Sequence, residues 1–214
     1  MAIKDIGSLA REIAQNSSGS FPLVVLDTGG LIDIVSATRM YNFNHKNGNK
    51  DPRYELTISF LKHLSERLPV LITPRTYKEM QEHGNVMLND HGIYEIPPKV
   101  VDFTLGTMEE SIKFISRLKK GTDLDSARYD AYWTSKNCCN GNAKKHGEGC
   151  SDTDKEILST AAYVSQCRTE SDKRKKIGQV IVISPDAHII KGAEFLKSSF
   201  GGKYSTIAPI STRQ

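Results

Sequence analysis

Three short runs of apolar residues constrain the fold of this chain more than any other feature. They cover residues 23–26 (LVVL), 70–72 (VLI) and 180–183 (VIVI). A run that is apolar at every position, and not only at alternate ones, is typical of a strand buried on both faces of a parallel sheet. Stretches with helical spacing separate the runs. The sequence therefore predicts an α/β fold, a three-layer α/β/α sandwich with a central parallel sheet.

Apolar spacing and capping residues place the helices. A further strand over 207–210 (IAPI) is expected at an edge of the sheet, because Pro209 has no N–H to donate. The expected helices are one over 3–15, one beginning near Leu31, one over 56–68 stopped by Pro69, one opened by Thr73 and Pro74, one over 108–118 ended by Gly121, and one opened by Ser151.

Length and composition indicate one globular domain. The 214 residues fit a single domain, residues 1–214, with an irregular insertion over about 129–150. No apolar stretch approaches the ~20 residues of a membrane span, and Asp5 and Glu12 lie where an export signal would be apolar. We therefore expect a cytoplasmic protein with reduced thiols and no membrane partner. A homodimer is left open, and the net charge of +4 permits a nucleic-acid partner without requiring one.

Four carboxylates stand out by their positions. Asp27 directly follows the first apolar run, and Asp186 follows the third, so both are expected at the carboxyl edge of the sheet, where ligands bind in such folds. Asp154 lies in the first turn of a predicted helix, and Glu79 one turn into another. Each alone is an ordinary turn, cap or surface residue, and Asp152 has the stronger case as the cap. The combination is more informative.

Converging carboxylates repel each other unless a cation lies between them. Oxygen ligands select hard ions, so the expected cofactor is Mg²⁺ or Mn²⁺. Such ions activate water at neutral pH and stabilise an in-line phosphoryl displacement. No histidine or cysteine nucleophile is required.

Four motifs, in order along the chain, resemble those of the PIN-domain ribonuclease family. The S-x-T-D form of the third is similar to the branch that contains ribosome-assembly endonucleases. The long segment between Glu79 and Asp154 differs from the small toxin-type members. The resemblance spans residues 23–186, and its motifs are residues 24–28 (VVLDT) with Leu31, residues 72–74 (ITP) followed by Glu79, residues 151–154 (SDTD) before 157–161 (ILSTA), and residues 182–186 (VISPD).

The resemblance implies a function as well as a fold. It implies metal-dependent endonucleolytic hydrolysis of single-stranded RNA, which leaves a 5′-phosphate and a 3′-hydroxyl. The residues that it assigns to catalysis and metal binding are Asp27, Glu79, Asp154 and Asp186, with Asp152 as an alternative third acid, and Thr28 and Ser184 in support.

Three other functions are alternatives to the nuclease, and each meets an objection in the sequence. Asp27-Thr28-Gly29 also spells the aspartic-protease motif, but that family needs an almost all-β chain in which two aspartates share a proton. Haloacid-type phosphatases need a second aspartate at the position of Gly29. A catalytically silent fold that serves as an RNA-binding or assembly scaffold is the more serious alternative, although the retained acids argue against it.

Two further groups of residues are candidates for binding. Cys138, Cys139, His146 and Cys150 suggest zinc, but adjacent cysteines fit zinc spacing poorly, so loop thiols remain the simpler interpretation. Basic and aromatic side chains could hold RNA, although they could equally be a solvated surface. These are Lys144, Lys145, Lys173, Arg174, Lys175 and Trp133.

Overall fold

A computed structural model of the chain describes residues 2–17, 21–45, 53–89, 98–118, 130–131, 134, 151–167 and 177–214. Within these residues a single sheet has the order β2-β1-β3-β4, and all of its strands are parallel. The strands are β1 (Leu23–Leu26), β2 (Val70–Leu71), β3 (Val180–Ser184) and β4 (Ile207–Ser211). They match the apolar runs to within one residue at each end, because Ile72 lies outside β2 and the last two strands each extend one residue further, so the predicted parallel sheet is confirmed, with β4 at an edge.

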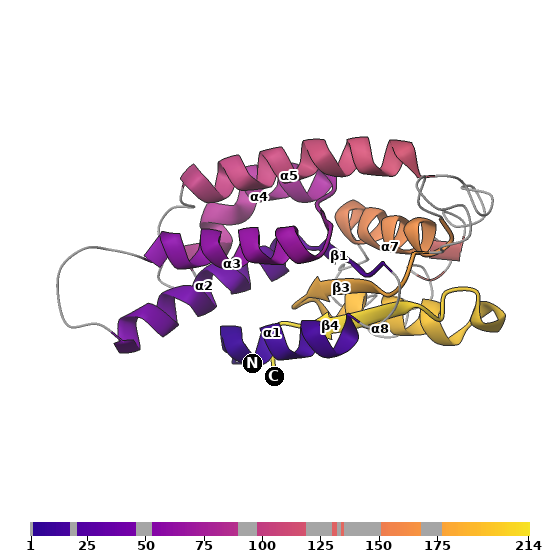
Figure 1. Ribbon diagram of the computed structural model, residues 1–214, viewed down its shortest axis with the longest axis horizontal. Coiled ribbons are helices and arrows are strands. Elements are labelled where there is room, and N and C mark those ends of the chain that lie inside the picture. The colour runs from indigo at the N-terminus through magenta and orange to yellow at the C-terminus, as the bar shows by residue number, and fades with distance from the viewer. Residues whose placement is uncertain are drawn as a thin grey trace, which may run out of the picture.

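The described residues form seven α-helices around the sheet (Figure 1). A 3₁₀ turn, η2 (Phe200–Gly202), precedes β4. The helices are α1 (Ile6–Asn16), α2 (Thr28–His45), α3 (Arg53–Arg67), α4 (Pro74–Asn89), α5 (Pro98–Arg117), α7 (Asp152–Ser165) and α8 (Ala187–Ser198). The mixed α/β class predicted from the sequence is confirmed.

Alternate residues of the buried strands feed two separate apolar cores. Val24 and Leu26 of β1 pack with residues from α1, α2, α3, α4 and α5. Leu23 and Val25 point to the opposite face and pack with residues from α7 and α8. The residues of β1 and β3 are fully buried, as expected for strands with apolar cores on both faces. The arrangement is therefore compatible with an α/β/α sandwich.

Several element boundaries differ from the prediction. The first helix begins at Ile6, because the Asp5 carboxylate caps it by accepting from the Ser8 N–H at 2.9 Å, and Ile3 forms an antiparallel bridge to Arg213 instead. The second helix begins three residues before Leu31, since the Leu31 N–H already donates to the Asp27 carbonyl at 2.9 Å.

The later helices also correct the prediction in detail. Ser151, and not Asp152, is the cap of α7, because its hydroxyl accepts from the Asp154 N–H. The α5 helix begins at Pro98, ahead of the expected start, and ends at Arg117, short of Gly121, which lies outside the described residues. The α3 helix stops before Pro69, and α4 opens after Thr73, both as predicted.

The structure also bears on the aspartic-protease alternative, on the expected insertion and on membrane association. The aspartic-protease alternative is wrong on fold, because that family needs an almost all-β chain. Most of the expected insertion lies outside the described residues, but Asp130, Ala131 and Thr134 are helical and buried, not irregular. Among the described residues, no helix is long and apolar enough to cross a membrane.

Candidate active site

The sheet order creates a switch point between β1 and β3. From β1 the chain continues to β2 on one side, and later to β3 and β4 on the other. In parallel sheets such a point opens a crevice at the carboxyl ends of the two central strands. Leu26 pairs with Ile183 there, and the next backbone bond runs from the Asp27 N–H to the Ile183 carbonyl at 3.1 Å. The backbone of Asp27 therefore lies at the switch point itself.

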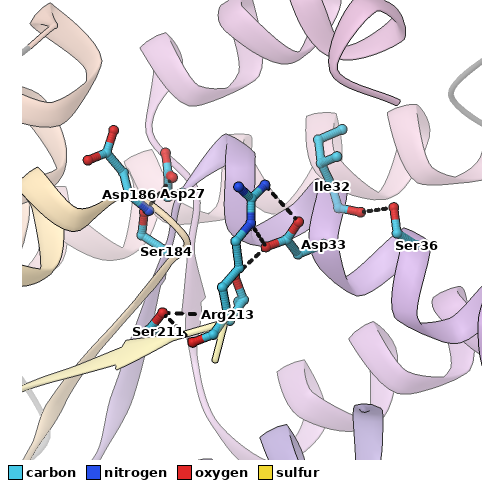
Figure 2. Close-up of polar contacts among 9 residues, drawn as sticks. Asp27, Ile32, Asp33, Ser36, Ser184, Asp186, Ser211 and Arg213 are labelled. Atoms are coloured by element: carbon cyan, nitrogen blue, oxygen red, sulfur yellow. Dashed lines mark hydrogen bonds and ion pairs between the residues drawn. The ribbon is translucent and has the colours of Figure 1, made fainter. Parts of the chain in front are cut away.

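Ser184 links the two aspartates that follow the central strands. Its hydroxyl donates to Oδ2 of Asp27 at 2.7 Å, and Oγ of Ser184 also accepts from the Asp186 N–H at 2.9 Å. Figure 2 shows Asp27 and Asp186 beside this serine. The Asp186 carboxylate also caps α8, because its Oδ1 accepts from the His188 N–H at 2.6 Å. Ser184 is fully buried, so this link is shielded from water.

Thr28 orients Glu79 through a hydrogen bond, as Ser184 orients Asp27. Its hydroxyl lies 2.8 Å from Oε2 of Glu79 and 3.2 Å from the Thr76 carbonyl, one turn earlier in α4. Thr28 is 1% exposed, and Glu79 is half-buried. A single hydroxyl at the start of α2 thus fixes α4 and the direction of its carboxylate. Thr28 directly follows Asp27 in the chain, so the two neighbouring residues both contribute to the site.

Asp154 is held by a reciprocal capping box at the start of α7. Its Oδ2 accepts from the Ser151 N–H at 2.8 Å, while its own N–H donates to the Ser151 hydroxyl at 3.1 Å. The α4 and α7 helices are tied together nearby, because the Arg75 N–H donates to Glu156 at 3.0 Å. Glu79 and Asp154 therefore approach the switch point from two helices with a fixed mutual position.

Asp152 lies apart from these four carboxylates. Its side chain is 63% exposed and forms ion pairs with Lys155 at 3.0 Å and Arg75 at 3.2 Å. The hydrogen bond and charge of Lys155, followed by the charge of Arg75, lower the pKa of Asp152. Of the two acids considered for the third position, Asp154 is the one that faces the other carboxylates. We call Asp27, Glu79, Asp154 and Asp186 the acid cluster.

Burial and mutual repulsion perturb the acid cluster. Burial, reinforced by the negative charges of Glu79 and Asp154, raises the pKa of Asp27 to about 7, although the Ser184 hydrogen bond opposes the shift. Burial is also the largest cause of a raised pKa at Asp154, where the charges of Asp186 and Glu79 add to it. Each of the four acids therefore acts electrostatically on at least one other, so the cluster is close enough to behave as a unit.

Little positive charge compensates the acid cluster. Within the described ranges, none of its members forms an ion pair with a lysine or arginine, and its one ion-pair contact is with His188, whose Nδ1 lies 3.7 Å from Oδ1 of Asp186. Buried carboxylates without a counter-charge are costly. A cation would remove that cost.

Two glycines allow α2 to pack closely against the end of β3. A Cβ on Gly30 would lie 2.7 Å from the Ile183 carbonyl oxygen, and one on Gly29 would lie 2.5 Å from a ring carbon of Pro185. Any side chain at these positions would push α2 away from the end of β3. The Gly-Gly pair therefore lets the first turn of α2 pack against the strand that precedes Asp186.

The donor set fits a hard cation in chemistry but is not pre-arranged around one. In the part of the chain that the structure describes, no three carboxylate, imidazole or thiol groups are arranged to hold a metal ion. Each acid instead gives one oxygen to a neighbouring N–H or O–H group. The charges of these acids nonetheless act on one another across the site.

Several predicted residues lie outside the described part of the chain. They are the RNA-binding candidates Trp133, Lys144, Lys145, Lys173, Arg174 and Lys175, and the zinc candidates Cys138, Cys139, His146 and Cys150.

Sequence reasoning missed one polar pair close to the site. Asp33 is 1% exposed, and Oδ2 of this residue accepts from Nε of Arg213 at 3.1 Å. A signal was present, since Asp33 interrupts the apolar run Leu31-Ile32-Asp33-Ile34-Val35, and a charge inside such a run needs a partner.

Comparisons of the chain with protein-family models, curated proteins and solved structures find no match in any of the three. The functional conclusions that follow therefore depend on the residues and their geometry.

Proposed function

We propose that this protein is a PIN-type, metal-dependent endoribonuclease that hydrolyses phosphodiester bonds of single-stranded RNA. One observation carries the proposal. Two buried acids, Asp27 and Asp154, meet Glu79 and Asp186 at the switch point of a parallel sheet, and no lysine or arginine of the described residues pairs with any of them. The order of the four motifs along the chain supports the same family.

The acid cluster would hold Mg²⁺ or Mn²⁺. When bound, such an ion lowers the pKa of a water molecule and stabilises the negative charge that develops on the attacking and leaving oxygens. Asp27 would be the deepest ligand, and Ser184 fixes its orientation through Oδ2. Thr28 orients Glu79 in the same way. With 41% of its side chain exposed, Asp186 marks the side from which the strand reaches the site.

Single strands are the favoured substrate because the acids lie at a sheet edge and the reacting phosphate must come close to them. A flexible strand can turn its backbone into such a crevice more easily than a stacked duplex. The proposed products carry a 5′-phosphate and a 3′-hydroxyl, as the family resemblance implies.

A silent scaffold that binds RNA is the second candidate. The observation in its favour is the absence, among the described residues, of three groups already arranged for a metal ion. Its distinguishing property is RNA binding without cleavage in the presence of metal.

Cleavage of a labelled single-stranded RNA tests the proposal. Purified protein is incubated with the RNA in Mn²⁺, in Mg²⁺ or in excess chelator, and the product ends are identified by their susceptibility to phosphatase and ligase. We expect cleavage with either metal ion, none with chelator, and 5′-phosphate ends.

Contaminating ribonucleases are the main source of error in this assay. The Asp27→Asn variant, purified in parallel, controls for them because the same contaminants would accompany it. Cleavage that persists in chelator, or that is equal in the variant, refutes the nuclease. RNA binding without cleavage in the presence of metal supports the scaffold.

A further inference from the structure

The Asp33–Arg213 pair joins α2 to the chain beyond β4. The Asp33 side chain is fully buried, and it accepts from the Thr212 hydroxyl at 2.5 Å, from Nε of Arg213 at 3.1 Å and from Nη2 of Arg213 at 3.2 Å. Figure 2 shows the guanidinium lying against this carboxylate. A two-point contact of this kind fixes the plane of the guanidinium group.

The backbone places Arg213 at the same sheet edge as the acid cluster. Ser211 pairs with Ser184 at the end of the sheet, and the Thr212 N–H donates to the Ser184 carbonyl at 3.2 Å. Arg213 and Asp186 each follow two residues after these paired serines. Arg213 therefore leaves the edge strand at the carboxyl end of the sheet, the end at which Asp186 follows β3.

Most of the guanidinium donors remain available. An arginine carries five N–H donors, and Asp33 accepts two of them. Within the described residues, no hydrogen bond engages Nη1, and 35% of the side chain is exposed. Asp33 itself is inaccessible, so a ligand at this point meets the positive member of the pair and not the negative one.

The acid cluster needs such a group, because carboxylates repel the phosphates of an RNA strand. Arg213 pairs with Asp33 and with no member of the cluster, so its charge is not consumed there. Planar guanidinium groups held in a fixed orientation are well suited to phosphate oxygens.

We propose that Arg213 binds a phosphate of the RNA backbone adjacent to the one that is cut. The inference rests on the proposed nuclease function, and it makes Arg213 a substrate-binding residue whose guanidinium is held in place by Asp33 and Thr212. The phosphate that it contacts differs from the reacting one, because the guanidinium is paired outside the acid cluster.

The salt dependence of RNA binding tests the proposal. Binding of a fluorescent single-stranded oligouridylate is measured by anisotropy over a salt series, in Mg²⁺ and in the Asp27→Asn background, so that the RNA stays intact. Loss of one phosphate contact to a single strand lowers the log–log salt slope by about 0.7. We expect this decrease for Arg213→Gln and an unchanged slope for the matched control Arg117→Gln. Arg117 lies in the last turn of α5 and lines a cavity with Pro69 and Val70 at the amino end of β2.

Two further variants separate a phosphate contact from a structural role. Asp33→Asn keeps the guanidinium but removes its buried partner charge, so we expect it to retain the parent slope. The double variant Asp33→Asn/Arg213→Gln removes both charges of the pair together, and we expect it to fold and to show the lowered slope.

The outcomes are decisive in both directions. An unchanged slope in Arg213→Gln or in the folded double variant overturns the proposal, as does a parent protein that does not bind RNA. An equal decrease in Asp33→Asn also overturns it, because that variant retains the guanidinium and a side-chain oxygen that can still accept from it. Absence of metal-dependent cleavage by the wild type, together with an Arg213-dependent slope, refutes the nuclease and leaves the phosphate contact standing.

Discussion

Asp27 is the side chain whose environment departs most from that of an ordinary turn aspartate. It is 5% exposed, it accepts a hydrogen bond from a buried serine, and it repels two further acids. Its position after an apolar run is visible in the sequence, but its neighbours are not. Ser184 is 157 positions away, and the hydroxyl–carboxylate contact exists only because β1 and β3 are adjacent.

Removing the charge of Asp27 should change how stability depends on pH. The folded protein keeps the Asp27 proton up to a pKa of about 7, whereas the unfolded chain releases it near 3.8. The stabilising contribution of this group is therefore complete below pH 3.8 and is lost as the pH rises through 7. At full ionisation the loss is about 4 kcal/mol at most.

The Asp27→Asn variant lacks this loss. Its free energy of unfolding relative to the wild type should therefore increase from pH 5 to pH 7 and level off above the folded pKa of about 7. Denaturant titrations of both proteins in excess chelator measure the difference. Parallel stability curves over that range would mean that Asp27 is not a buried, repelled carboxylate.

Ser184→Ala should move the pH profile of cleavage. The hydrogen bond from Ser184 opposes the rise in the Asp27 pKa, so its loss should raise that pKa further and shift the acidic limb of the rate profile to higher pH. Ser165→Ala is a matched control, because Ser165 is also buried but donates to the Ala162 carbonyl within α7. A shift in neither variant, or in both, would contradict the assigned role of Ser184.

At the scale of secondary-structure elements, the contact between the start of α2 and the end of β3 determines the geometry of the site. Its strands are predictable, because a short run of apolar residues bounded by turn residues is typical of a buried strand. The start of α2 is not predictable in the same way, since Gly29 and Gly30 resemble a turn in sequence. Only the close approach to Ile183 and Pro185 explains why glycines open a helix here.

Gly30→Ala should destabilise the protein and impair cleavage together. The new methyl carbon would lie 2.7 Å from the Ile183 carbonyl oxygen, so α2 must shift and carry Thr28 away from Glu79. We expect a loss of roughly 1–3 kcal/mol, the usual range for overpacking.

Gly106→Ala is the control for the glycine experiment. Gly106 is in α5, and a Cβ there meets no atom within 4 Å. Alanine is the better helix former by roughly 0.5–1 kcal/mol, so this variant should be more stable than the wild type. Thermal denaturation of both variants measures the effects. A Gly30→Ala protein as stable as Gly106→Ala would exclude a tight junction.

At the scale of the whole molecule, the chain builds its site from segments far apart in sequence. The four motifs predicted which acids to consider, and the structure places them at one switch point. The strand order β2-β1-β3-β4, which produces that switch point, was not predictable from apolar runs alone. The apolar run around Asp33 indicates that this residue needs a partner, but it does not indicate that the partner is Arg213, 180 positions away.

Divalent metal should stabilise the folded protein. The acid cluster repels itself when it is empty, and an ion that binds the folded state alone stabilises it by mass action, by about 2.7 kcal/mol at one hundred times its dissociation constant. Differential scanning calorimetry should show a melting temperature that rises with Mn²⁺ and returns with chelator. The gain should be much smaller in Asp27→Asn. An equal gain in that variant would place the ion elsewhere.

The rates of RNA cleavage by Asp154→Asn and Asp152→Asn, measured together with the wild type in Mn²⁺, test the central claim most directly. These two acids are separated by a single residue in the first turn of α7, but only Asp154 belongs to the acid cluster. An asparagine at 154 can still accept from the Ser151 N–H, so the helix cap is preserved. We predict that the cleavage rate of Asp154→Asn falls by at least about a hundredfold, the scale of removing one preorganised electrostatic group, while Asp152→Asn keeps the wild-type rate. Equal rates in the two variants, with both proteins folded, would contradict the account.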